Sequence, residues 1–343
     1  MNALVTGGSG YFGSLLIDKL LKKGFNVSSL DINAPDNLNE SVKFYRADIR
    51  DGETLKTLFK GVDLVFHNVA QVPLAKDATL FNEVNINGTR NVCSAALHNN
   101  IEKIIYTSSS AIYGVPKSNP VDENTLAMPG ESYGEAKLYG EKICESFSKK
   151  GVNVSIIRPR TILGHGRLGI FSIFFNWISQ GVNIPVLNEG RNLYQFIHAE
   201  DLADACILSS KFDSKLSYFN IGSEDFGTMR KTIQDLCDYA NTGSKVYSLP
   251  LKPIEIIMNV TSKLGLSPLG PYHSLMYGRS LYFNITKAKK ELGFDPKYST
   301  SQMFQESYDW FLENKQKLSS SENTSAHKRI VNESILKVLR WFS

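Results

Sequence analysis

Cysteine is scarce in this sequence. Its 343 residues include four cysteines, Cys93, Cys144, Cys206 and Cys237, and no two of them form a CxxC pair. This spacing argues against a disulfide framework and against a zinc site, so we expect no metal. Unpaired thiols are typical of a reducing compartment, and we therefore expect a cytoplasmic protein.

Long apolar runs and strong charge are also missing. No stretch approaches the ~20 apolar residues that span a bilayer. Residues 2–6 already have the pattern of a buried strand, so we expect no cleavable signal before the fold. The net charge of +4 is mild and no basic cluster is interleaved with aromatic residues, which excludes a typical nucleic-acid track.

Two hydrophobic periods alternate in the first 160 residues. Short apolar runs, which we expect to be strands, occur at 3–6, 26–30, 42–46, 62–67, 103–107 and 152–157. Several of them are separated by helical patterns, as at Leu15, Leu16, Lys19 and Leu20. Strands that alternate with helices predict right-handed βαβ units and a parallel sheet covered on both faces. After about residue 160 the rhythm becomes irregular, which indicates a smaller part over the carboxyl ends of the strands.

Glycines recur where the first expected strand turns into a helix. In Thr6-Gly7-Gly8-Ser9-Gly10-Tyr11-Phe12-Gly13, the residues Gly7, Gly10 and Gly13 are spaced by three. Glycines at such a turn let the backbone approach a pyrophosphate, which the helix N-terminus then stabilises. Tight turns need glycine in any case, but here strand, glycines, helix and second strand follow in order. The segment therefore predicts dinucleotide binding on a Rossmann-type fold.

An acidic residue, Asp31, ends the second expected strand. A carboxylate there accepts hydrogen bonds from the ribose hydroxyls of the adenosine and repels the 2′-phosphate of NADP. The next residues, Ile32 and Asn33, bring no arginine to offset it. The bland alternative is a turn-forming aspartate. We predict NAD as the cofactor.

Tyr133 and Lys137 stand four residues apart in Tyr-Gly-Glu-Ala-Lys. On a helix this spacing places both side chains on one face, so they can address one pocket. A free tyrosine has a pKa near ~10, and a neighbouring ammonium lowers it toward the working range of a base. Such pairs are common on helix surfaces, but this one follows Thr107-Ser108-Ser109-Ser110, a hydroxyl-rich run at the end of a strand. Active sites of open parallel sheets lie at such ends.

Taken together, these residues resemble the extended short-chain dehydrogenase/reductase family, in particular its branch of NAD-dependent nucleotide-sugar epimerases and dehydratases. The resemblance covers about residues 1–312. Further motifs that carry it, in chain order, are Ala47-Asp48-Ile49, Asn68-Val69-Ala70, Val84-Asn85-Ile86-Asn87-Gly88-Thr89, Ser110-Ala111-Ile112-Tyr113-Gly114, Arg158-Pro159, Phe196-Ile197-His198-Ala199-Glu200-Asp201, Phe219-Asn220-Ile221-Gly222 and Leu292-Gly293-Phe294-Asp295-Pro296.

The resemblance implies a role for each matching residue. It makes Ser109, Tyr133 and Lys137 the catalytic set and assigns His198 to a structural turn. Asp48 and Ile49 would hold the adenine, Ala70 and Asn85 would line the groove, and Lys137 would also grip the nicotinamide ribose. The implied cofactor-binding residues are Gly7, Gly10, Tyr11, Phe12, Gly13, Asp31, Asp48, Ile49, Ala70, Asn85, Thr107, Tyr133, Lys137 and Pro159.

The resemblance also narrows the reaction. Dehydratases of this branch carry Asp and Glu directly after the catalytic hydroxyl, whereas this chain has Ser110 and Ala111. Elimination of water needs an acid and a base, so a dehydratase is not expected. A C4-type epimerase of nucleotide-diphosphate sugars, which keeps its NAD, is the first reading. An NAD-dependent dehydrogenase or reductase, of a sugar nucleotide or of a 3β-hydroxysteroid-like alcohol, is the second, and a non-catalytic NAD-binding regulator is the alternative of another class.

The substrate site is less defined. Where the epimerase pattern has an arginine for the diphosphate, this chain has Tyr194, so the charge is expected from Arg160, Arg191 or Arg279. We also expect Ser109 and Ser110 to contact the substrate. The apolar stretches 170–175 and 254–258 would suit either core packing, which we favour, or a sterol-like substrate.

Three parts are expected along the chain. Residues 1–160 form an NAD-binding Rossmann domain to which segments near 193–222 return, and residues 161–312 form the main, discontinuous substrate-binding part. Residues 313–343 form a polar linker and an amphipathic helix, which we expect to dock on the protein rather than lie on a membrane surface. By the resemblance, the helices containing residues 79–98 and 131–150 would form a homodimer.

Overall fold

The computed structural model describes residues 1–343 except 36, 38, 72–77, 165, 265–275 and 321–343. The amphipathic helix predicted from residue 328 onward therefore lies outside the described residues, together with its docking or membrane role.

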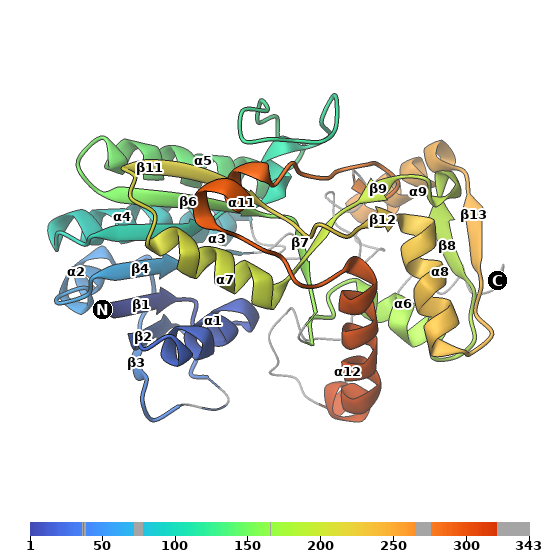
Figure 1. The fold of residues 1–343 in the computed structure, drawn as a ribbon, viewed down its shortest axis with the longest axis horizontal. Helices are drawn as coiled ribbons and strands as arrows, with labels where there is room; N and C mark the ends of the chain where they lie inside the picture. Colours follow the sequence, from blue (N-terminus) through green and yellow to red (C-terminus); the bar gives the residue numbers. More distant parts are fainter. Residues whose placement is uncertain (36, 38, 72–77, 165, 265–275, 321–343) are drawn as a thin grey trace.

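A seven-stranded parallel sheet forms the centre of the larger half of the molecule (Figure 1). Its strands lie in the order β11-β6-β5-β4-β1-β2-β3. Their bounds are β1 (Asn2–Thr6), β2 (Asn26–Asp31), β3 (Lys43–Arg46), β4 (Leu64–His67), β5 (Lys103–Thr107), β6 (Asn153–Pro159) and β11 (Leu216–Ile221). The six expected strands and β11, to which the chain returns later, thus all pair in parallel with their neighbours in the sheet. The predicted doubly wound α/β fold is confirmed.

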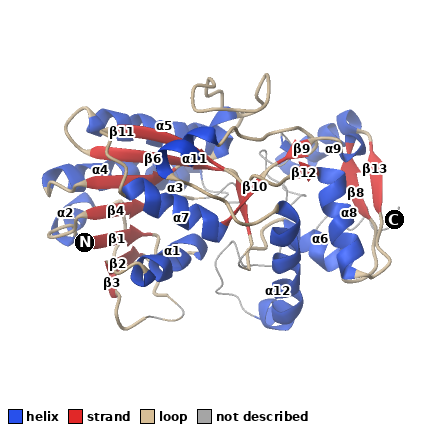
Figure 2. Ribbon diagram, viewed as in Figure 1, coloured by secondary structure: helices blue, strands red, loops and turns tan. Residues whose placement is uncertain are grey.

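Helices cover both faces of this sheet, which explains why every residue of β4 and β5 is buried. One face packs against α1 (Tyr11–Lys22), α7 (Ala199–Ser210) and α11 (Thr286–Leu292). The other face packs against α2 (Gly52–Leu58), α4 (Thr89–His98) and α5 (Ser132–Ser148). Figure 2 shows these helices in front of and behind the red strands. Short elements between them are α3 (Ala78–Asn82), the π-helix η1 (Glu83–Gly88) and the 3-10 turn η2 (Ser110–Tyr113).

A smaller part lies beyond the carboxyl ends of the strands, at the right of Figure 1. Its own core gathers large side chains such as Trp177, Phe175 and Phe304. Its helices are α6 (Phe171–Ile178), α8 (Met229–Ala240), α9 (Leu251–Lys263) and α12 (Thr300–Ser320). Its short strands are β7 (Thr161–Leu163), β8 (Ile184–Leu187), β9 (Leu193–Tyr194), β10 (Phe196–His198), β12 (Gly227–Thr228) and β13 (Val246–Leu249), with the 3-10 turn η3 (Asn188–Gly190).

The chain leaves the large sheet after β6 and returns to it at β11, which pairs with β6 from Leu216 opposite Val154 to Ile221 opposite Pro159. The division into a cofactor part and a substrate part at about residue 160 stays a prediction. One detail of it is wrong: residues 313–320 are the end of α12 and no linker. This helix is anchored by the buried Phe304 and Phe311, and Glu, Lys and Gln continue it because they favour helical backbone.

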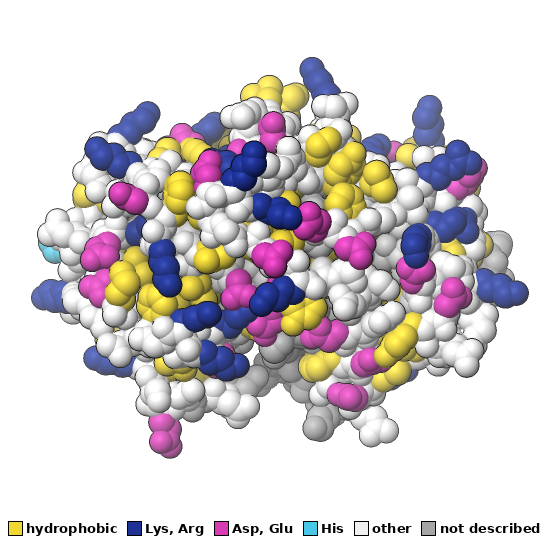
Figure 3. All heavy atoms as spheres, viewed as in Figure 1, with side chains coloured by type: hydrophobic (Ala, Val, Ile, Leu, Met, Phe, Trp, Pro, Cys, Tyr) yellow, Lys and Arg dark blue, Asp and Glu magenta, His cyan; other side chains and the backbone are white. Residues whose placement is uncertain are grey.

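The charged side chains are mixed on the surface. On the face in Figure 3, basic and acidic side chains alternate over both halves of the molecule without a patch of one sign. Such a surface gives no electrostatic track for a polyanion.

Candidate active site

A cavity of about 580 Å³ opens at the carboxyl ends of the parallel strands. Gly7, Asp31, Asn68, Thr107 and Pro159, each at or just after the end of a different strand, contribute to its wall. Because all strands are parallel, these ends meet at one edge of the sheet. This cavity therefore lies where the sequence predicts the site.

The glycine turn shapes one end of this cavity. Gly7 has a φ of +75°, which favours glycine. A Cβ on Gly13 would lie 2.0 Å from the carbonyl oxygen of Gly7, so only glycine allows the first helix to approach the first strand this closely. The helix α1 begins at Tyr11 and its N-terminus opens to the cavity. The turn thus fits the pyrophosphate of a dinucleotide.

Asp31 is held in place at the end of β2. Its carboxylate accepts backbone N–H bonds from Ser9 (3.2 Å) and Asn33 (3.0 Å). Burial raises the pKa of Asp31, and these two hydrogen bonds oppose the rise. The side chain lines the cavity, where a ribose hydroxyl can donate to it.

Asp48, expected near the adenine, is paired with a neighbour. Arg50 Nη2 lies 2.6 Å from Asp48 Oδ2 and holds the pKa of that carboxyl below its ordinary value. Arg50 also pairs with Glu83 at 3.1 Å. Since two carboxylates neutralise Arg50, this cavity-lining cation offers little charge to a 2′-phosphate.

Tyr133 and Lys137 lie on the first turns of α5, where the carboxylate of Glu131 caps the helix by accepting from the backbone of Tyr133 (2.8 Å) and Gly134 (2.7 Å). Ser109, at the start of η2, lines the same cavity as Tyr133, and its Oγ accepts from the backbone N–H of Ala111 at 3.2 Å. Lys137 is buried and its Nζ donates to the carbonyl of Thr107 at 2.7 Å. A hydroxyl, a phenol and an ammonium thus face one cavity.

The electrostatics of these groups differ from the sequence-based expectation. Burial raises the pKa of Tyr133, while the hydrogen bond from Ser109 and the charge of Arg167 lower it. Burial lowers the pKa of Lys137 to about 8. In the chain alone, Arg167 is therefore the cation that acts on the Tyr133 pKa, and Lys137 holds the end of strand β5.

A buried ion pair fixes the helix α5, which carries Tyr133. The guanidinium of Arg158 on β6 donates to both oxygens of Glu141 on α5, at 3.0 and 2.7 Å. Ser108, next to Ser109, donates to the same carboxylate at 2.5 Å. One carboxylate thus ties the helix of Tyr133, the serine turn and the next strand together.

The family model of the NAD dependent epimerase/dehydratase family matches residues 3–222. The chain belongs to this family. It is 49% identical to the uncharacterized protein y4nG of Sinorhizobium fredii over 338 residues, and this match covers 98% of this chain and 85% of that protein. It is 27% identical over 311 residues to the mouse (Mus musculus) sterol-4-alpha-carboxylate 3-dehydrogenase, decarboxylating, covering 85% of this chain and 86% of that protein. The crystal structure of UDP-glucose 4-epimerase with UDP-glucose from Thermotoga maritima matches with a TM-score of 0.76 and 25% identity, covering 92% of this chain and 99% of that one.

Members of the epimerase/dehydratase family are NAD-dependent enzymes of the short-chain dehydrogenase/reductase type, and this chain has their fold. Most residues predicted for cofactor, catalysis or substrate line the one cavity. They are Gly7, Gly10, Tyr11, Phe12, Gly13, Asp31, Asp48, Ile49, Ala70, Thr107, Ser109, Ser110, Tyr133, Lys137, Pro159 and Arg160.

Three predicted residues lie elsewhere. Asn85 is buried and does not line the cavity, because its amide is used to hold the backbone of Gln71, with hydrogen bonds of 2.8 and 3.2 Å. Arg191 is exposed and pairs with Glu189, and Arg279 pairs with Glu255 at 2.7 Å on α9. Neither arginine lines the cavity, and their expected contacts with the substrate stay a prediction.

Arg160 is the predicted substrate arginine that does reach the cavity. It is 1% exposed, and its Nη1 donates to Ser110 at 2.8 Å. The guanidinium lies over the ring of Tyr194, 4.6 Å from its centroid. Within the described part of the chain, its Nε and Nη2 have no hydrogen-bond partner.

Sequence reasoning missed Arg167. It lies over the ring of Tyr11 (5.5 Å) in the cavity that holds Tyr133. The Tyr11 hydroxyl donates to the carbonyl of Gly164, which brings the segment of Arg167 onto the glycine turn. The signal was present as Gly166-Arg167-Leu168-Gly169, a glycine-rich stretch with one cation.

Among the described residues, no group of three His, Cys, Asp or Glu side chains could hold a metal ion. In the same residues, no helix is long and apolar enough to cross a membrane.

Proposed function

We propose that this chain oxidises a secondary alcohol of its substrate to a ketone and reduces it again, with Tyr133 as the acid/base. The observation that carries the proposal is that Ser109, Tyr133 and Lys137 line the same cavity as the glycine turn. NAD, when bound, would supply the hydride acceptor and donor for the substrate carbon.

The chain's own residues then handle the proton. Ser109 holds the substrate oxygen, and Tyr133 takes the hydroxyl proton as the ketone forms. The ammonium of Lys137 and the guanidinium of Arg167 favour the phenolate, because opposite charge nearby lowers a tyrosine pKa. On return, Tyr133 gives the proton back to the oxygen.

The residues present fit NAD. The α1 N-terminus with Gly7, Gly10 and Gly13 would hold the pyrophosphate, Asp31 the adenosine ribose, and Ile49 the adenine. Tyr11, Phe12, Asp48, Ala70, Thr107 and Pro159 complete the walls, and Lys137 would hold the nicotinamide ribose.

The first candidate reaction is C4 epimerisation of a nucleotide-diphosphate sugar. The matched family and the fold shared with UDP-glucose 4-epimerase favour it. Arg160 adds support, since two buried nitrogens without partners suit an anionic oxygen. Ser110 and Ala111, where a dehydratase would carry acids, favour epimerisation over loss of water.

The second candidate is a dehydrogenase that exchanges its NAD and acts on an apolar alcohol, as the sterol dehydrogenase relative does by its name. Tyr194 supports this candidate specifically, because it stands where the epimerase pattern has an arginine for the diphosphate. The Tyr194 hydroxyl lies 3.0 Å from the hydroxyl of Thr161 and brings no positive charge. Arg191 and Arg279 are paired with carboxylates away from the cavity.

The test is incubation of the purified protein, without added cofactor, with UDP-, GDP-, dTDP- and CDP-sugars. A new isomer of unchanged mass, with stoichiometric NAD released on denaturation, supports the epimerase. Protein free of NAD and no isomer contradict the epimerase, and turnover that needs added NAD then identifies the dehydrogenase. A Tyr133→Phe control excludes a contaminating enzyme.

Two further expectations belong to the same proposal. The protein is cytoplasmic, and it forms a homodimer through α4 and α5, which pack against each other on one face of the sheet. Analytical ultracentrifugation tests the dimer: a monomer at micromolar concentration contradicts it. A non-catalytic regulator is the alternative class, and turnover with NAD excludes it.

A further inference from the structure

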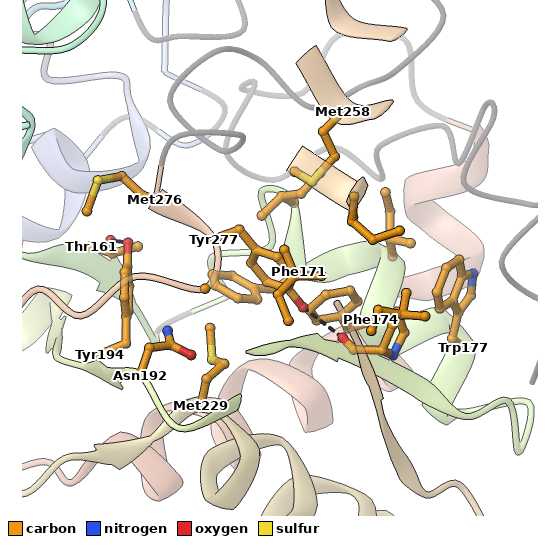
Figure 4. Close-up of a pocket in the computed structure, with 17 residues that line it drawn as sticks. Thr161, Phe171, Phe174, Trp177, Asn192, Tyr194, Met229, Met258, Met276 and Tyr277 are labelled. Atoms are coloured by element: carbon orange, nitrogen blue, oxygen red, sulfur yellow. Dashed lines mark hydrogen bonds between the residues drawn. The ribbon is translucent and has the colours of Figure 1, made fainter. Parts of the chain in front are cut away.

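A second cavity, of about 150 Å³, adjoins the cofactor cavity (Figure 4). The two share Thr161, Ile170 and Phe171 in their walls. Figure 4 shows Thr161, Tyr194 and Asn192 at one end and Trp177 at the other, with Phe171 and Phe174 between them. The second cavity therefore extends from the site of Tyr133 into the smaller part of the molecule.

The wall of this cavity is apolar. Helices α6 and α9, strands β8 and β13, and residues 276–278 contribute aromatic, aliphatic and methionine side chains. The tyrosine hydroxyls are satisfied within the wall itself, since Tyr277 donates to the carbonyl of Pro185 (2.9 Å) and Tyr194 meets Thr161. Asn192 Oδ1 and Trp177 Nε1 are the buried polar side-chain atoms of this wall that lack partners in the described structure.

A nucleoside diphosphate does not suit such a wall. Its base carries several hydrogen-bonding groups and its phosphates carry charge, and burying these without partners is costly. Two isolated polar atoms do not match them. None of the nearby cations that the structure describes lines this cavity: Arg160 lines the cofactor cavity, and Arg191 and Arg279 are paired with Glu189 and Glu255.

A hydrocarbon suits it well. An apolar cavity of about 150 Å³ stays dry and binds groups of benzene size. Each methylene moved from water into such a cavity improves affinity by about fourfold. Asn192 Oδ1 remains as one acceptor for a hydroxyl group.

We propose that this cavity binds a hydrocarbon group attached to the alcohol carbon, so that the substrate is a secondary alcohol on an aliphatic skeleton. The proposal rests on the hydride transfer proposed above and selects the second of its two candidates. In the reaction the carbinol hydrogen passes as hydride to NAD and the hydroxyl proton passes to Tyr133.

The experiment uses the full chain with NAD and a homologous series from butan-2-ol to octan-2-ol, with bicyclic decalin-2-ol and UDP-glucose as comparators. We expect kcat/KM to rise by about fourfold per methylene until the cavity is filled. A flat series would overturn the proposal.

A matched pair of variants locates the effect. Ile254 lines the cavity from α9, whereas Ile257 on the same helix is 54% exposed and does not. We expect Ile254→Lys to lower kcat/KM for octan-2-ol at least tenfold while butan-2-ol changes little, and Ile257→Lys to leave both unchanged. Equal effects of the two variants would contradict the cavity as the site.

Binding is read separately from turnover. Titration of octan-2-ol into the NADH-loaded protein should change tryptophan fluorescence, and Trp177→Phe should remove that change. If the alcohol binds with NADH and is not oxidised, the proposed function fails, and only the binding of a hydrocarbon group in this cavity stands. If UDP-sugars are turned over and the alcohol does not bind, the inference fails and the proposed function stands.

Discussion

The two cavities that meet at Thr161 are built in different ways. The cofactor cavity takes its walls from strand ends and the turns directly after them, and its polar atoms are held by backbone groups, as Asp31 is by Ser9 and Asn33. The apolar cavity takes its walls from side chains of several short elements far apart in the sequence. In the proposed reaction, the first cavity carries out a chemistry that many substrates can undergo, and the second selects the substrate.

The largest expected effect separates chemistry from binding. Tyr133→Phe removes the group that moves the proton, and we expect kcat to fall by about 10²–10⁴-fold. NAD affinity and alcohol binding should stay within about twofold, because neither cavity loses its walls. Steady-state kinetics and isothermal titration measure the two, and retained turnover would disprove the role of Tyr133.

The frame of the cofactor cavity comes next. Glu141→Gln leaves the guanidinium of Arg158 buried without its counter-charge, where the two side chains are 1% and 8% exposed. We expect a loss of about 3–5 kcal/mol in the free energy of unfolding. Urea denaturation measures it, with Glu135→Gln, an exposed change on the same helix, as the control. Equal stability of the two variants would show that the ion pair does not hold the frame.

Asp31 sharpens the comparison at the cofactor end. Asp31→Asn removes a charge-assisted hydrogen bond to the ribose. This should lower the affinity for NAD by about 10–100-fold and reduce the preference of the protein for NAD over NADP. Fluorescence titration with both cofactors measures it. Asp18→Asn, an exposed residue of α1, is the control. Unchanged NAD affinity would show that Asp31 does not bind the ribose.

The part of the molecule that contains the large sheet should lose stability in acid. His67, buried at the end of β4, has its pKa lowered from 6.5 to about 3, mainly by burial. Below pH 6.5 His67 becomes protonated in the unfolded chain, whereas in the folded chain it stays neutral down to about pH 3. Its contribution to the free energy of unfolding is therefore fully present above pH 6.5 and is lost as the pH falls toward 3. This group alone should remove about 2 kcal/mol between about pH 7.5 and 5. Urea denaturation of His67→Gln should lose less stability over that interval, and an unchanged pH slope would contradict the assignment.

The smallest effect is expected from Arg191, which lies outside the apolar cavity. Its substitution tests whether the substrate needs a positive charge there. Arg191 is 78% exposed in its pair with Glu189. Because surface pairs contribute about 0–1 kcal/mol, Arg191→Gln should leave stability and KM nearly unchanged. A large rise in KM for a nucleotide sugar would place Arg191 in the substrate site and count against a hydrocarbon substrate.

The sequence allowed the cofactor half to be predicted because its signals are local. Each of the six expected strands is present, and Gly7, Asp31 and Tyr133 line one cavity because parallel strands must end at one edge. The placement of Arg191 and Arg279 could not be predicted, since an ion pair with Glu189 or Glu255 depends on side-chain packing that spacing does not encode. The two- to four-residue strands β7–β10, β12 and β13 are too short for a periodic pattern.

Strand β11 borders β6 although 56 residue positions separate Pro159 from Leu216 in number order, and most of the wall of the apolar cavity lies between them. During synthesis, the ribosome must therefore release the chain beyond Ile221 before the sheet can acquire its last strand. Until then the outer edge of β6 has no partner and is open to pairing with another nascent chain. The order of synthesis thus makes the interval between β6 and β11 the stretch in which a chaperone has most to protect.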